Sequence, residues 1–176
     1  MTLPSLYDQL PSLGIPQLLS QPQQTLRLEV EGYFPDFPTL TPIQGWLTVR
    51  HGGTYLELAT ACNTITTLTC NRCLGQYNYR LALDTQELIW LRDETPGRGE
   101  DALGLGAEEG GWDDLAETLP PLGSVNLGQW LYEQLCLSLP SQQVCDRACP
   151  GIAPPQSPSL GGDGRWSALD RLRSQL

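Results

Sequence analysis

The 176-residue sequence contains no lysine, one histidine and no run near the roughly 20 apolar residues that span a bilayer. Its first 24 residues hold no basic residue and several prolines, unlike a secretory signal peptide. We therefore expect a cytoplasmic protein without a membrane segment, whose thiols stay reduced. His51, beside Gly52-Gly53, is predicted to be a surface residue, and motifs that need a further histidine are excluded.

Negative charge is concentrated in one stretch of the chain. The formal net charge is −10, and nine acidic residues lie between Asp93 and Ser124 against the single base Arg98. Nine of the arginines lie elsewhere, so the overall charge does not exclude a nucleic-acid partner. The same stretch holds seven glycines, which predicts a solvated acidic loop over residues 93–124.

Alternating apolar and polar residues predict β-strands in the first half of the chain. Apolar side chains alternate from Leu26 to Val30, from Trp46 to Arg50 and from Tyr55 to Cys62. After Asn63-Thr64 the pattern resumes over residues 65–70, and a long strand runs from Tyr77 towards Trp90. Gly52-Gly53 supplies a tight turn. We predict an α+β fold built on an antiparallel meander of four to five strands.

One main helix is predicted in the C-terminal half. Asn126 is a capping residue with Gln129 three positions later, the apolar side chains that follow fall on one face, and the helix ends before Pro140. The expected organisation is a Pro/Gln-rich arm over 1–24, a domain over 25–152, a linker over 153–164 and a short helix over 165–176. No phosphate-binding motif or carboxylate dyad is evident, so we predict no enzyme and no small-molecule substrate.

Four of the six cysteines form two closely spaced pairs, Cys70-Asn-Arg-Cys73 and Cys145-Asp-Arg-Ala-Cys149. Structural zinc takes four thiolates from two such pairs when the fold brings them together. We interpret the pairs as a zinc clamp that joins the meander to the segment after the helix. Gly75 is expected to allow a tight turn around the first pair, while Cys62 and Cys136 are predicted to be buried apolar residues.

Two other interpretations of the thiols remain open at this level. A Cys-x-x-Cys pair can be a redox dithiol, although Cys70 ends a strand and Gly75 disfavours a following helix. Alternatively, the two pairs are unrelated and hold no metal, since the second has three residues between its cysteines.

The order of these motifs resembles the YceD family. The similarity is carried by Leu68-x-Cys70-x-Arg72-Cys73, an acidic stretch, Val125-Asn126-Leu127 at a helix start, Cys145 with Cys149-Pro150-Gly151, and Arg165-Trp166-x-x-Leu169-x-x-Leu172. Asn126 stands where the family commonly has Asp, and both residues cap helices. The resemblance implies a metal-binding, nucleic-acid-binding protein associated with accumulation of large-subunit (23S) ribosomal RNA.

Two functions follow as hypotheses. The first is a ribosome-biogenesis factor that binds large-subunit ribosomal RNA or a ribosomal protein, with Arg72, Arg147, Arg165 and Trp166 as candidate nucleic-acid contacts. The alternative for these residues is a solvated surface with Trp166 anchoring the terminal helix. The second function is a zinc-stabilised interaction module that docks a basic protein through the acidic loop, without RNA contact.

Overall fold

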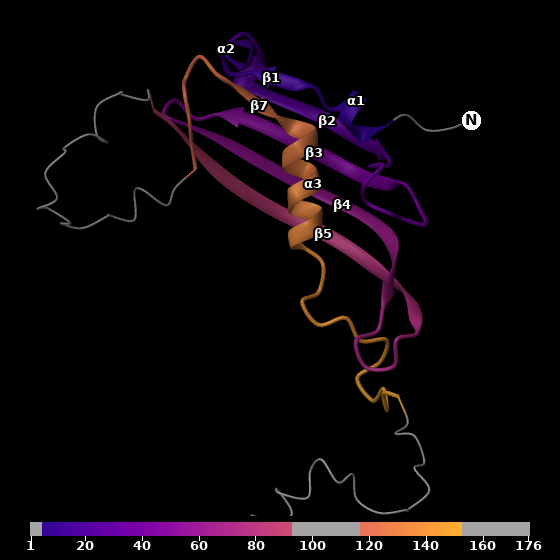
Figure 1. Ribbon diagram of the computed structural model, residues 1–176. Helices are drawn as coiled ribbons and strands as arrows, with labels where there is room; N and C mark the ends of the chain where they lie inside the picture. The colour runs from indigo at the N-terminus through magenta and orange to yellow at the C-terminus, as the bar shows by residue number, and fades with distance from the viewer. Residues whose placement is uncertain (1–4, 93–116, 153–176) are drawn as a thin grey trace, which may run out of the picture.

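The computed structural model describes residues 5–92 and 117–152. A curved sheet with the strand order β2-β3-β4-β5-β6 makes up one layer (Figure 1). Its strands are β2 (Thr25–Gly32), β3 (Ile43–His51), β4 (Tyr55–Thr69), β5 (Gln76–Leu91) and β6 (Thr118–Leu119). The first four are antiparallel neighbours, which confirms the predicted α+β fold and its meander.

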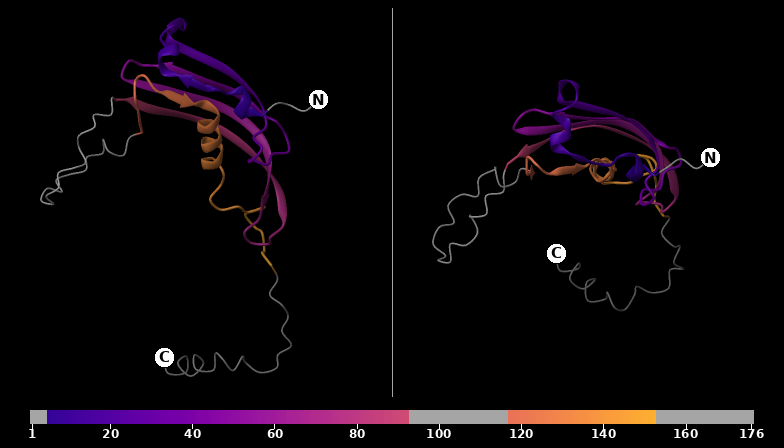
Figure 2. Two further views of the ribbon diagram at one scale, coloured as in Figure 1. Left: turned by 45° about the horizontal axis from the view of Figure 1, so that its top comes forward. Right: turned by 90° about the horizontal axis from the view of Figure 1, so that it is seen from above.

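The second layer lies in the hollow of the sheet, where the views in Figure 2 show α3 covered by the curved strands. Short elements from both ends of the described chain build it together. They are α1 (Leu6–Gln9), β1 (Ser12–Gly14), α2 (Ile15–Leu18), the 3-10 turn η1 (Pro22–Gln24), β7 (Ser124–Asn126) and α3 (Leu127–Leu137). β1 and β7 pair antiparallel, so residues before the sheet and after it are held side by side.

The hydrophobic core fills the space between these layers. Every second residue of β4 from Leu56 to Leu68 is buried, as period-two strand geometry requires. From the other layer, α3 buries Leu127, Trp130, Leu131 and Leu135 against the sheet. Residues of the Pro/Gln-rich arm also contribute, because Leu6, Leu10, Ile15 and Leu18 are at most 1% exposed.

The predicted break at Asn63-Thr64 is absent, since β4 continues through it as one 15-residue strand. Thr64 and Thr66 occupy buried positions on the inner face of β4, and their hydroxyl groups are hydrogen-bonded to loop carbonyls. Thr64 Oγ1 donates to Thr41 O at 2.8 Å, and Thr66 Oγ1 donates to Pro38 O at 2.7 Å. A buried hydroxyl costs free energy unless it is hydrogen-bonded, so these two contacts allow the strand to reach the cysteines.

The cap of α3 is confirmed. The Asn126 side chain accepts a hydrogen bond from the Gln129 backbone N–H at 3.0 Å, which fixes where the helix begins. Trp130 Nε1 and Gln134 Nε2 both donate to the Glu87 carboxylate on β5, so polar contacts as well as apolar ones hold α3 to the sheet. This fixed helix directs the residues that follow it towards the end of the β4–β5 hairpin (Figure 1).

Two smaller features are the short strand β6, which was not predicted, and the turn after His51, which was. Thr118–Leu119, which the sequence placed in the acidic loop, forms the short parallel strand β6 against the end of β5. His51 is the last residue of β3, beside the predicted turn. Its Nδ1 accepts a hydrogen bond from the Gly53 N–H, and Gly53 has a φ of +93°.

In the part of the chain described here, no helix has both the length and the apolar character needed to cross a membrane.

Candidate metal centre

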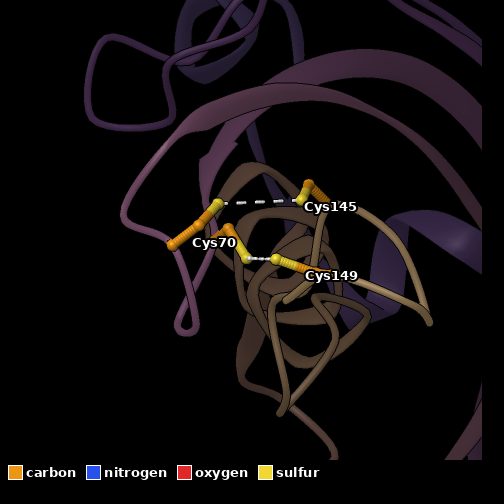
Figure 3. Close-up of side chains that lie close together, drawn as sticks. Cys70, Cys145 and Cys149 are labelled. Carbon is orange, nitrogen blue, oxygen red and sulfur yellow. Dashed lines mark hydrogen bonds between the residues drawn. The ribbon is translucent and has the colours of Figure 1, made fainter. Parts of the chain in front are cut away.

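The four paired cysteines meet at the tip of the β4–β5 hairpin, with all four sulfur atoms within 4.8 Å of one another. The shortest contacts cross between the pairs: Cys70 Sγ lies 3.8 Å from Cys149 Sγ, and Cys73 Sγ lies 3.8 Å from Cys145 Sγ (Figure 3). Disulfide sulfurs would be about 2.05 Å apart, so these are four free thiols. Their convergence argues against the interpretation of two unrelated pairs.

The first pair sits on a compact turn between β4 and β5. The Cys70 N–H donates to Gly75 O, and the Leu74 N–H donates back to Cys70 O, each at 2.9 Å. The turn differs from the expectation for Gly75, because Leu74 adopts the left-handed backbone with a φ of +60° and Gly75 has no positive φ. The Arg72 N–H lies 3.4 Å from Cys70 Sγ, a donor that favours thiolate at that sulfur.

The second pair is shaped by an aspartate that the sequence analysis did not single out. Asp146 Oδ1 accepts a hydrogen bond from the Ala148 N–H at 2.7 Å, and Asp146 O accepts one from the Cys149 N–H at 3.0 Å. An aspartate that bonds the backbone two residues ahead makes an Asx turn. The Cys-Asp-x-x-Cys pattern of residues 145–149 could have indicated this turn, which accommodates the third intervening residue.

Three contacts join the two cysteine turns directly. Asn71 N–H donates to Gln143 O at 2.7 Å, while Arg72 Nη1 lies 3.1 Å from Arg147 O and 3.4 Å from Cys149 O. Gly151, at a φ of +78°, comes so close that a Cβ would lie 3.3 Å from Arg72 O. These pairings could not be predicted from local sequence patterns, because they link residues more than 70 positions apart.

The sulfur atoms differ in environment. Cys70 and Cys149 are buried, Cys73 is half-buried and Cys145 is exposed, so one side of the cluster faces solvent. Backbone N–H groups of Cys145 and Cys73 lower the pKa of the Cys70 thiol to about 6. Hydrogen bonds with the neighbouring Cys149 and Cys70 thiols raise the pKa of Cys145 to about 12. Four thiolates would repel one another strongly unless a cation lay between them.

The donor set fits a tetrahedral metal ion. Four sulfurs at about 2.3 Å from a central Zn²⁺ lie about 3.8 Å from each other, close to the two cross-pair contacts. Of the remaining cysteines, Cys62 is buried on the inner face of β4, where burial raises the pKa of its thiol, and Cys136 is half-buried on α3. Neither belongs to the four-sulfur cluster.

The candidate nucleic-acid residues are only partly covered by the structure. Arg72 and Arg147 both lie at the cysteine cluster with exposed side chains, although the Arg72 guanidinium also contacts carbonyl groups of the second turn. Arg165 and Trp166 lie outside the described residues, as do the predicted linker and terminal helix and residues 93–116 of the acidic loop.

Fold and site together define an α+β protein in which a four-cysteine cluster, a candidate metal site, ties the end of a curved sheet to the segment after its covering helix. The chain belongs to the YceD family, described as large ribosomal RNA subunit accumulation protein YceD, whose model matches residues 58–173. Membership implies a role in accumulation of large-subunit ribosomal RNA. Searches of curated proteins and of solved structures gave no match.

Proposed function

We propose that this protein is a non-enzymatic factor that supports large-subunit ribosomal RNA accumulation and ribosome biogenesis by binding the RNA at its zinc-clamped end. The observation that carries the proposal is the placement of Arg72 and Arg147 around the four-cysteine cluster. Zinc would be held by Cys70, Cys73, Cys145 and Cys149, and it would supply a rigid link between the two turns rather than a reaction.

The two arginines have different roles in this proposal. Arg72 spans the turns through the Arg147 and Cys149 carbonyls, so its first role is to hold the surface together. The Arg147 side chain is exposed and forms no ion pair with any residue in 5–92 or 117–152. An unpaired exposed guanidinium is suited to a phosphate contact, because it loses no existing partner on binding.

Direct RNA contact is tested by measuring the affinity of the zinc-loaded full chain for large-subunit ribosomal RNA over a salt series. Each phosphate contact contributes roughly one unit to the dependence of log affinity on log salt. We expect Arg147→Ala to weaken binding and reduce that slope by about one. The matched control is Arg27→Ala, since Arg27 stacks on Trp46 away from the cysteine cluster. Absence of measurable binding by the unmodified chain, or equal losses in both variants, would contradict the proposal.

A second function is favoured by the acidic charge beside α3. Glu87, Glu117 and Glu133 lie close together: burial, and then the negative charges of Glu87 and Glu133, raise the pKa of Glu117. Together with the acidic stretch that ends there, this region is suited to docking a basic ribosomal protein. Deleting residues 97–114 while keeping β6 should then abolish capture of ribosomal proteins and leave RNA binding unchanged, whereas retained capture excludes this docking mode.

A further inference from the structure

β5 leaves a long stretch of its outer edge without a backbone partner among the described residues. β4 pairs with β5 along one side from Gln76 to Trp90, whereas β6 covers only Trp90 and Leu91 on the other side. Unpaired strand edges pair readily with another strand, and proteins usually protect them with charges, bulges or covering segments. The stretch from residue 76 to residue 88 is therefore an edge that needs an explanation.

The hydrogen bonds at the end of β5 show which amides face this edge. The Trp90 and Arg92 N–H groups donate outward to Glu117 O and Leu119 O, while the Leu91 N–H donates inward to Thr54 O. Because strand geometry has a period of two, the even-numbered residues from 78 to 88 present their N–H and C=O groups to the free edge. The side chains of these same residues are exposed.

We propose that this edge pairs with β5 of a second copy of the chain, antiparallel and centred on Ala82. In that register Ala82 faces its own counterpart, and Arg80 faces Asp84 of the other copy in two symmetric ion pairs. Asn78 faces Gln86 in the same way, so the polar side chains on the outer face between residues 78 and 86 meet complementary ones. On the inner face, Leu81 meets Leu83. Opposite charges directly across two strands stabilise their pairing, and like charges weaken it.

The surface between β5 and α3, beside this edge, also favours pairing with a second copy of the chain. A groove between β5 and α3 is lined by Ala82–Thr85 together with Gln134, Leu137 and Ser138. Leu137 is 77% exposed although it is an apolar residue next to the strand edge. A two-fold axis at Ala82, perpendicular to the sheet, places the second α3 on the same face as the first, and Leu137 of each copy then lies on the face that the two β5 strands share. The pairing thus makes one continuous sheet and buries apolar surface.

The opposite edge of the sheet is protected and makes a useful contrast. On β2 the outward-facing residues include Glu29 and Glu31, and the Gln9 side chain donates to the Glu31 carbonyl at 2.9 Å. Two acidic side chains and a covered carbonyl disfavour strand addition there. By the same period of two, the Glu29 N–H faces away from β3, which makes this position a matched control for Ala82.

The experiment is analytical ultracentrifugation of the zinc-loaded full chain over a dilution series. Ala82→Pro removes an edge-facing N–H without removing a bond to β4, so the monomer keeps its sheet and dimerisation should be lost. Glu29→Pro should leave dimerisation unchanged. Arg80→Asp and Asp84→Arg alone should each weaken the dimer roughly tenfold by placing like charges opposite each other, and the double variant should restore it.

Hydrogen exchange gives an independent readout. Amides of even-numbered residues from 78 to 86 should exchange rapidly in dilute protein and slowly in concentrated protein, while the intervening amides stay protected at both concentrations. A chain that remains monomeric at all concentrations overturns the proposal, as does a dimer that is insensitive to Ala82→Pro or equally sensitive to Glu29→Pro. Protection of the even-numbered amides that does not depend on concentration also overturns it, because a segment of the same chain would then cover the edge.

Discussion

The Arg72 guanidinium donates to the Arg147 backbone carbonyl at 3.1 Å and lies 3.4 Å from the Cys149 carbonyl, so one side chain joins the two cysteine turns. Hydrogen bonds from a charged donor are stronger than neutral ones. The contact holds the second pair against the first from outside the sulfur cluster. Arg72 is therefore a positioning residue for the candidate metal site as well as a candidate RNA contact.

Replacing Arg72 by alanine should weaken zinc binding by roughly 10- to 100-fold, the usual effect of losing a residue that orients metal ligands. Competition with a chromophoric chelator measures this directly. The control is Arg147→Ala, because Arg147 contributes its backbone carbonyl to the contact and its side chain can be removed without loss. Equal zinc affinities in the two variants would show that the guanidinium bridge does not support the site.

Removal of the α3 cap should destabilise the fold. Asn126→Ala deletes the acceptor for the Gln129 N–H, and loss of such a cap costs about 0.5–2 kcal/mol. Chemical denaturation of the zinc-loaded protein measures the change. Asn126→Asp keeps a carboxylate acceptor at the same position and should retain most of the stability. If the alanine and aspartate variants unfold at the same denaturant concentration, the cap does not contribute.

The contact between Trp130 and Glu87 makes a separate prediction about how α3 is held. Trp130→Phe keeps an aromatic ring in the core but leaves the half-buried Glu87 carboxylate with one donor, Gln134, instead of two. Loss of a hydrogen bond to a charged group costs about 1.5–3 kcal/mol. The free energy of unfolding should fall by an amount in that range. In the background Glu87→Gln, the same change should cost less, and an equal cost would assign the effect to packing.

Glu117 should make stability depend on pH. Burial and the charges of Glu87 and Glu133 raise its pKa in the folded state, so the native protein holds this proton more tightly than the unfolded chain does. Stability associated with Glu117 is therefore present at low pH and is lost as pH rises through the window above the unfolded-state pKa. Glu117→Gln should be slightly more stable than the unmodified protein near neutral pH. Thermal unfolding of both proteins over a pH series checks this, and parallel curves would contradict it.

Local patterns in the sequence were sufficient to predict the fold class, the meander, the helix cap and which four cysteines cluster. These features depend on strand alternation, capping chemistry and thiol spacing, all of which are visible within a few residues. The continuity of β4 through Thr64 was not predictable in this way, because it depends on the Thr41 carbonyl supplied by a distant loop. The Arg72 bridge and the left-handed Leu74 likewise arise from how the two turns pack together.

The role of the N-terminal arm in the core was also not apparent from its composition. Prolines and glutamines identified residues 1–24 only as an arm, whereas in the structure Leu6, Leu10, Ile15 and Leu18 are fully buried under the sheet. Their spacing follows neither a helix nor a strand over any long stretch, because the arm changes direction at α1, β1 and α2. Only the tertiary arrangement, including the pairing of β1 with β7, brings these side chains inward.

The central claim is that a single metal ion joins the two cysteine turns and stabilises the fold. Elemental analysis of the native protein, paired with thermal unfolding before and after chelation, tests it most directly. We expect about one zinc per chain and a clear loss of stability when zinc is removed, since metal binding energy adds to folding energy. The variant Cys70→Ser, Cys73→Ser should hold no zinc and unfold as the chelated protein does. A metal-free native protein whose unfolding is unchanged by chelator and by these substitutions would contradict the account.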